Sequence, residues 1–118
     1  MHARVSLGKW GEDLAARYLI DSGLTVLDRG WRCRDGEIDI VARDGTTLVV
    51  CEVKTRTTEA FGSPLAAVTP SKVRRLRRLA AAWLQAHDER ATQVRLDVIG
   101  ILADSHARPL IEHLRGVD

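Results

Sequence analysis

The stretch GEIDIVARDGTTLVVCEVKTR, residues 36–56, decides the fold of this chain. Aliphatic and polar residues alternate on both sides of Asp44 and Gly45, and an Asp-Gly pair between two such segments is typical of a β-hairpin with a two-residue turn. Taking this pair as the centre of the turn places Ile40 opposite Val49. One face of the predicted hairpin is then entirely apolar, and it comprises Ile38, Ile40, Ala42, Val49, Cys51 and Val53. This face is expected to lie in the core.

The opposite face of the hairpin changes character along its length. Near the turn it is aliphatic, but toward the far end it carries Glu37, Asp39, Glu52 and Lys54. In the predicted register Asp39 is diagonal to Glu52, at a backbone separation of about 7 to 8 Å. Carboxylates that lie this close oppose each other's ionisation, and a divalent cation would offset that repulsion. The hairpin therefore predicts a metal site held by Asp39 and Glu52.

The residue types in this cluster indicate phosphodiester hydrolysis. Carboxylate oxygens are the ligands that Mg²⁺ prefers, and such an ion is commonly held by one or two of them together with water and substrate phosphate. Lys54 beside Mg²⁺ or Mn²⁺ would orient or deprotonate a water molecule and neutralise charge on a phosphoryl transition state. Two alternatives stay open. A surface ladder of cross-strand ion pairs would use the same residues, and Glu37 is equally a ligand neighbour or a partner of Lys54.

The segments around the hairpin predict two helices and three further strands. Apolar residues recur at helical spacing over residues 6–22 and 71–87, and Thr69 and Pro70 supply an N-cap and a first-turn proline for the second helix. Strands are predicted over residues 24–28, 94–102 and 109–114, a polar connection over 30–35 and a long loop over 57–68. The predicted order is α-β-β-β-α-β-β, an α/β fold with a mixed central sheet flanked by helices.

Composition bounds the class of protein. The chain has 118 residues, of which 45% are hydrophobic and 29% charged, so one globular domain over residues 1–118 is expected. No apolar run approaches the roughly 18 residues of a membrane span, and no signal peptide is recognisable, so a cytoplasmic location without membrane contact is predicted. Cys33 and Cys51 lack ligand spacing, which favours reduced packing residues. The formal net charge of +2 permits a polyanionic partner.

Basic residues concentrate in the second predicted helix. One face of that helix would carry Lys72, Arg74, Arg75 and Arg78. Such a face suits a track along a nucleic-acid backbone, and equally a solvated helix surface. Arg56, at the end of the second hairpin strand, is a further candidate for phosphate contact. Asp97, by contrast, is expected to be a buried structural partner of an arginine.

The spacing of the acidic cluster resembles a nuclease signature. Asp39, a twelve-residue gap and then Glu52-Val53-Lys54 resemble the PD-(D/E)XK motif of restriction-endonuclease-like nucleases, which include Holliday junction resolvases. Ile38 stands where many members have proline. The segments GEDLAARYL, GEIDIVARD, LVVCEVKTR, FGSP and RLDVIG, spread over nearly the whole chain, are similar to the YraN family of uncharacterised bacterial proteins.

This resemblance implies a restriction-endonuclease-like fold. In resolvases of this superfamily an acidic residue of the first helix joins the metal site, and Glu12 is the residue that matches. The leading hypothesis is a Mg²⁺- or Mn²⁺-dependent endonuclease acting on DNA, including branched DNA, with Asp39 and Glu52 as ligands, Lys54 catalytic and Glu12 assisting. By analogy with symmetric two-strand cutting, a homodimer is expected. The alternatives are a nucleic-acid-binding module with the same fold but no turnover, and a structural domain that pairs through a sheet edge.

Overall fold

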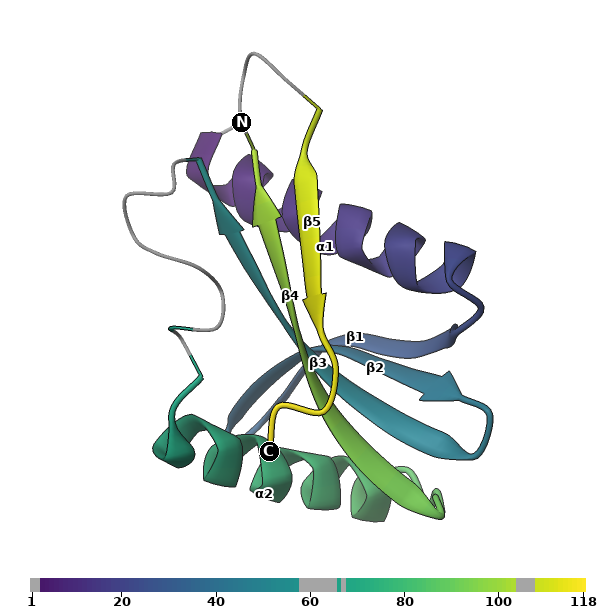
Figure 1. The fold of residues 1–118 in the computed structure, drawn as a ribbon. Helices are drawn as coiled ribbons and strands as arrows, with labels where there is room; N and C mark the ends of the chain where they lie inside the picture. The colour runs from purple at the N-terminus through teal and green to yellow at the C-terminus, as the bar shows by residue number, and fades with distance from the viewer. Residues whose placement is uncertain (1–2, 58–65, 67, 104–107) are drawn as a thin grey trace.

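The computed structural model describes residues 3–57, 66, 68–103 and 108–118, and its elements follow the order α-β-β-β-α-β-β. They are α1 (Ala3–Asp21), β1 (Thr25–Cys33), β2 (Gly36–Asp44), β3 (Thr47–Arg56), α2 (Pro70–Ala86), β4 (Gln93–Leu102) and β5 (Leu110–Leu114). The five strands form a mixed sheet in sequence order, in which β3 and β4 are parallel and the other neighbours antiparallel. Helices α1 and α2 cover opposite faces of the sheet (Figure 1), which confirms the predicted α/β class.

A hydrophobic layer lies on each face of the sheet, one between the sheet and α1 and the other between the sheet and α2. The α1 layer is built on Ala15, Ala16 and Leu19, and the α2 layer on Leu76, Leu79, Ala80 and Trp83. Strand β3 contributes to both layers, because Val49 and Cys51 pack on the α1 side whereas Leu48 and Val50 pack on the α2 side. A strand covered on both faces needs an almost continuous apolar sequence, which explains the run LVVC.

The hairpin turn lies one residue later than predicted. Asp44 pairs with Thr47, so Gly45 and Thr46 are the two central turn residues. Gly45 has a φ of 62°, and glycine at the first central position is what a type II′ turn requires. The prediction that Asp44 and Gly45 form the centre of the turn is therefore wrong.

The register of the two strands changes accordingly. Ile40 lies opposite Cys51 instead of Val49, a shift of two residues. Because side chains alternate with a period of two, this shift leaves most residues on the predicted face, and the apolar pattern could not distinguish the two registers. The pairing ends at Ile40 and Cys51, so the predicted diagonal arrangement of Asp39 and Glu52 lies beyond the paired part of the hairpin.

Strand β1 is longer than predicted. It ends at Cys33, which pairs with Gly36, so most of the predicted polar connection is strand. The pairing with β2 shifts between Val26 and Asp28, which marks an irregularity of the bulge type. As an edge strand, β1 tolerates polar residues because one of its sides lacks a neighbouring strand.

Helix α2 begins as predicted. Thr69 Oγ1 accepts a hydrogen bond from the backbone N–H of Lys72 at 3.1 Å, and Pro70 occupies the first turn. This cap fixes the first turn of α2 and the backbone of Lys72 within it. Most of the predicted loop over residues 57–68 lies outside the described residues.

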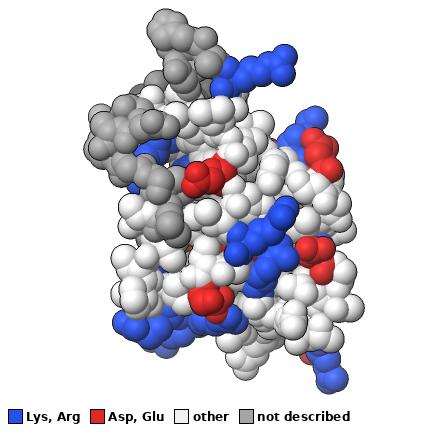
Figure 2. All heavy atoms as spheres, viewed as in Figure 1, with Lys and Arg blue, Asp and Glu red and all other residues white. Residues whose placement is uncertain are grey.

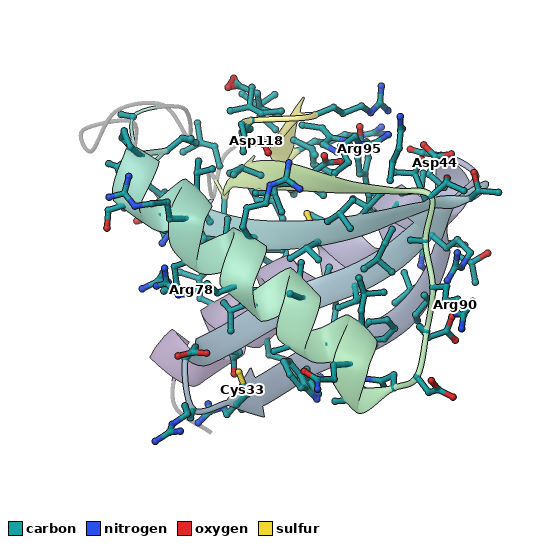
Figure 3. The ribbon with its side chains drawn as sticks, turned by 90° about the horizontal axis from the view of Figure 1, so that it is seen from below. Cys33, Asp44, Arg78, Arg90, Arg95 and Asp118 are labelled. Atoms are coloured by element: carbon teal, nitrogen blue, oxygen red, sulfur yellow. The ribbon has the colours of Figure 1, made fainter. Side chains whose placement is uncertain are left out.

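A buried polar network secures the C-terminal part of the sheet. Asp97 is fully buried and accepts hydrogen bonds from Arg95 at 3.0 and 3.1 Å and from the backbone N–H of Gly116 at 3.1 Å. His113 Nε2 lies 2.7 Å from the same carboxylate. Burial raises the pKa of Asp97, but the hydrogen bonds from His113 and Arg95 outweigh it and hold that pKa below its usual value. The predicted structural pair is confirmed, and Arg95 also reaches Asp44 (Figure 3).

The described helices and the two cysteines both bear on the class of protein predicted from the sequence. Among the described residues, no helix is both long enough and apolar enough to cross a membrane. Cys33 and Cys51 are free, as predicted. Cys51 is buried in β3, and burial raises the pKa of its thiol well above the usual value, whereas Cys33 is partly exposed.

Close packing of α1 on β3 depends on Gly11. A Cβ at this position would overlap Thr55 Oγ1, whereas a Cβ at Gly8 would meet no atom within 4 Å. We expect Gly11→Ala to lower the free energy of unfolding by about 1–3 kcal/mol, because the helix or Thr55 must move. Gly8→Ala should raise it by up to about 1 kcal/mol through helix propensity. Urea unfolding followed by circular dichroism measures both, and equal effects would contradict the close approach.

Candidate functional site

The hydrogen-bond ladder between β2 and β3 stops at Ile40 and Cys51. Beyond that pair the backbone N–H of Val53 donates to Asp39 Oδ2 at 2.8 Å, so a side-chain carboxylate replaces a backbone partner. Regular alternation along β2 is lost at this point, because Ile38 packs in the α2 layer although Ile40 packs in the α1 layer. The prediction that Ile38 and Ile40 share a face is therefore wrong.

A pocket of about 470 Å³ lies between the end of β3 and the start of α1. It is lined by Leu7, Gly8, Glu12, Asp39, Val53, Lys54, Thr55 and Arg56. The close approach of Gly11 to Thr55 holds α1 against the strand end, which brings Glu12 to the pocket wall. The structure thus brings together four of the residues predicted as site residues: Glu12, Asp39, Lys54 and Arg56.

The carboxyl group of Asp39 is difficult to ionise. Its pKa is raised from 3.8 to about 6, chiefly by burial, and the charges of Glu52, Glu12 and Glu37 act in the same direction. The hydrogen bond from the N–H of Val53 opposes this effect. Because burial and neighbouring negative charges disfavour the carboxylate, a positive charge bound beside it would be strongly stabilising.

Glu52 is held by a lysine of α2. Its Oε2 lies 2.8 Å from Lys72 Nζ, and the Lys72 and Glu52 side chains are only 17% and 13% exposed. Oε2 is buried and has no well-formed hydrogen bond within the described part of the chain, so this contact is an ion pair with unfavourable angles. Lys54 lies in the same neighbourhood: burial lowers its pKa, Lys72 adds to that effect and Glu52 opposes it. Two ammonium groups therefore act on one carboxylate.

Two acidic residues near the site contact arginine side chains. Glu37 accepts a hydrogen bond from Arg32 Nε at 2.8 Å, so Arg32 rather than Lys54 is its partner. Glu12 Oε1 lies 3.4 Å from a guanidinium nitrogen of Arg29. Across the described residues, no three His, Cys, Asp or Glu side chains are arranged to hold a metal ion. From the described residues, a metal ion at this site would therefore be held by at most two side chains of these types.

Basic side chains gather along α2, which forms the lower edge of the molecule in Figure 2. Arg74, Arg75 and Arg78 are exposed, and Figure 3 shows Arg78 extending from the side of the helix. Arg77 instead pairs with Asp118. Lys72, predicted to belong to the exposed basic face, points inward to Glu52. Of the four residues predicted to form the exposed basic face of α2, Arg74, Arg75 and Arg78 face solvent and Lys72 does not.

The contact between Lys72 and Glu52 could not be predicted from the hairpin pattern. The two residues belong to different elements, and nothing in their spacing relates a lysine of α2 to an acid of β3. The usable signal was the N-cap at Thr69, which fixes Lys72 as the third residue of the helix and so within its first turn. Pairing it with Glu52 required the packing of α2 on the sheet.

The chain is similar to known proteins over most of its length. A family model described as "Uncharacterised protein family UPF0102" matches residues 11–101. The chain belongs to the UPF0102 family. UPF0102 proteins of Streptomyces coelicolor and Streptomyces griseus are 57% and 55% identical to it, over 99% of this chain and 92% and 99% of those proteins. A UPF0102 protein of Beutenbergia cavernae is 54% identical, with 99% of each chain covered. These names state no activity, so they confirm the family resemblance alone.

The raised pKa of Asp39 predicts a pH-dependent stability for this UPF0102 chain in the presence of a chelator. The folded protein retains the Asp39 proton up to about pH 6, whereas the unfolded chain releases it near 3.8. The contribution of this proton to the free energy of unfolding is fully present below the pKa of Asp39 in the unfolded chain. It is lost as the pH rises through the pKa of Asp39 in the folded protein, and the total change is about 3 kcal/mol.

Asp39→Asn carries no such proton and serves as the reference. Between about pH 3 and pH 7, wild type should lose about 3 kcal/mol of unfolding free energy relative to the variant. Urea unfolding in buffered EDTA at several pH values measures the difference. A difference that stays constant over this range would contradict the buried state of the Asp39 carboxyl.

Proposed function

We propose that this UPF0102 chain is a metal-dependent endonuclease that hydrolyses phosphodiester bonds in DNA, including branched DNA. Asp39 and Glu52 carry the proposal: they are carboxylates on neighbouring strands at the point where the ladder ends, and Lys54 follows two residues further along β3. The raised pKa of Asp39 supports it, because strongly perturbed carboxyl groups in a pocket are typical of functional sites.

The two carboxylates fit a divalent cation such as Mg²⁺ or Mn²⁺. Both supply hard oxygen ligands, and Glu52 Oε2 lacks a well-formed hydrogen bond within the described residues. The bond from Val53 engages only Oδ2 of Asp39. Mg²⁺ often takes one or two protein carboxylates and completes its shell with water and substrate phosphate. When bound, such a cation would neutralise charge that develops on the phosphoryl oxygens.

The remaining residues act on the phosphate and on water. Lys54 Nζ would hold or transfer a proton at the attacking water, and the burial that lowers its pKa favours this role. Glu12 would assist from α1 by accepting a hydrogen bond from water, and Arg56 on the pocket wall would bind a neighbouring phosphate. Farther along the nucleic acid, the backbone would be bound by Arg74, Arg75 and Arg78.

The motif spacing and the fold support the same proposal. Asp39 followed by Glu52-Val53-Lys54 fits the PD-(D/E)XK signature, and a mixed sheet between two helices is compatible with a restriction-endonuclease-like fold. Symmetric cutting of a branched junction would need two such sites. We therefore include a homodimer in the proposal.

Metal binding and cleavage test the enzyme proposal. We expect calorimetric titration to detect Mn²⁺ binding by wild type and not by Asp39→Asn. Asp39→Asn, Glu52→Gln and Lys54→Met should each lower the rate of Mn²⁺-dependent cleavage of branched, flapped or linear DNA by about 100-fold or more, because each removes a charge that acts on the transition state. Glu37→Gln is the matched control, since Glu37 lies near Asp39 but pairs with Arg32.

The control variant should retain both metal binding and cleavage, and circular dichroism verifies the fold of each protein. DNA binding by wild type without metal-dependent cleavage of any of these substrates would contradict the enzyme proposal. It would favour a nucleic-acid-binding module with the same fold. If wild type shows no measurable binding to nucleic acid, a purely structural domain is favoured instead.

The exposed arginines of α2 predict electrostatic DNA binding. Replacing Arg74, Arg75 and Arg78 together with Gln should weaken binding to a short duplex and lower the slope of log Kd against log salt concentration by about 2 to 3, because fewer counterions are released. Fluorescence anisotropy over a series of salt concentrations measures both quantities. Arg17→Gln, an exposed change on α1, should leave the slope unchanged. Equal slopes for the triple variant and wild type would contradict this assignment.

A further inference from the structure

Lys72 connects α2 to the acidic cluster. Its backbone N–H is held by the Thr69 cap, while its side chain crosses to the sheet and brings Nζ within 2.8 Å of Glu52 Oε2. Both side chains are largely removed from solvent, at 17% and 13% exposure. Neighbouring Arg74 and Arg75 of the same helix are exposed. Lys72 is therefore the residue of the predicted basic face whose side chain lies against the acidic cluster instead of extending into solvent.

The ion pair is well placed but poorly bonded. Taking an ammonium and a carboxylate out of water is costly, and the attraction between them repays this cost fully only when hydrogen bonds are also well formed. Glu52 Oε2 has no such bond within the described part of the chain. A dication that binds Glu52 directly would compete effectively with this single, imperfectly bonded ammonium.

We propose that Lys72 is an internal counter-ion of Glu52, a positioning residue that a divalent metal ion must displace before it can bind. This inference rests on the proposed metal site. Lys72 keeps Glu52 paired and oriented in the metal-free protein, and it lowers metal affinity by the free energy needed to break the ion pair. Metal binding in turn releases the Lys72 ammonium toward solvent, at the end of α2 that also carries Arg74 and Arg75.

Manganese titration of Lys72→Gln tests the displacement. Glutamine removes the charge but keeps the backbone N–H that Thr69 caps, so the start of α2 is preserved. We expect calorimetry to give a Kd for Mn²⁺ about tenfold lower than that of wild type, because no ion pair has to be broken. Arg77→Gln is the matched control: it removes one positive charge from α2 at a residue that pairs with Asp118 rather than with Glu52, and it should change the Kd for Mn²⁺ little.

Amine labelling of the wild-type protein provides a second readout that needs no substitution at Lys72. The chain has three lysines, Lys9, Lys54 and Lys72. Acetylation followed by mass spectrometry should modify Lys72 several-fold faster in Mg²⁺ than in EDTA, because metal binding frees its amine. Lys9, which is 71% exposed, should react at the same rate in both conditions.

The outcomes separate this inference from the proposed function. A Kd for Mn²⁺ that is equal or higher in Lys72→Gln, or labelling of Lys72 that Mg²⁺ leaves unchanged, overturns the displacement and leaves the metal site standing. Absence of Mn²⁺ binding to both proteins, with and without DNA, overturns the metal site and the displacement with it. Mn²⁺ binding to Lys72→Gln but not to wild type supports the displacement in its strongest form.

Discussion

The hydrogen bond from the backbone N–H of Val53 to Asp39 Oδ2 is the constraint on which the candidate site depends. It satisfies a donor that the ladder between β2 and β3 no longer pairs, so the two strands can stop pairing while this partly buried N–H keeps a partner. The same bond holds a carboxylate between the strands. Burial and the nearby acids raise the pKa of the carboxyl group that this bond holds in place, although the bond itself acts in the opposite direction.

The architecture was predictable because local signals agreed with one another. The apolar run of β3, the helical stripe of α2 and the cap at Thr69 each have one favourable structural interpretation, and the structure contains all three. Asp39 and Lys54 do line one pocket, as the hairpin pattern predicted, although the alternation of β2 breaks beside Asp39 and the predicted register was two residues off. These features depend on neighbours in sequence or on a directly connected strand.

What the sequence did not reveal depends on contacts between distant elements or on small differences in backbone geometry. Two registers of the hairpin satisfy the apolar pattern almost equally, and they differ only in which residues pair beside the turn, where the structure pairs Asp44 with Thr47. The displacement of Ile38 into the α2 layer follows from the loss of pairing at Asp39, which no pattern of residue types encodes. The inward turn of Lys72 depends on how α2 rests on the sheet.

The two thiols of the chain lie in opposite environments, and this makes them natural probes of its motions. Cys51 is enclosed within a central strand and its thiol is hard to ionise, so an alkylating reagent reaches it as a reactive thiolate only when β3 opens. Cys33 lies at the end of the edge strand and is accessible without such an event. The ratio of their reaction rates therefore reports the opening equilibrium of the sheet in the unmodified protein.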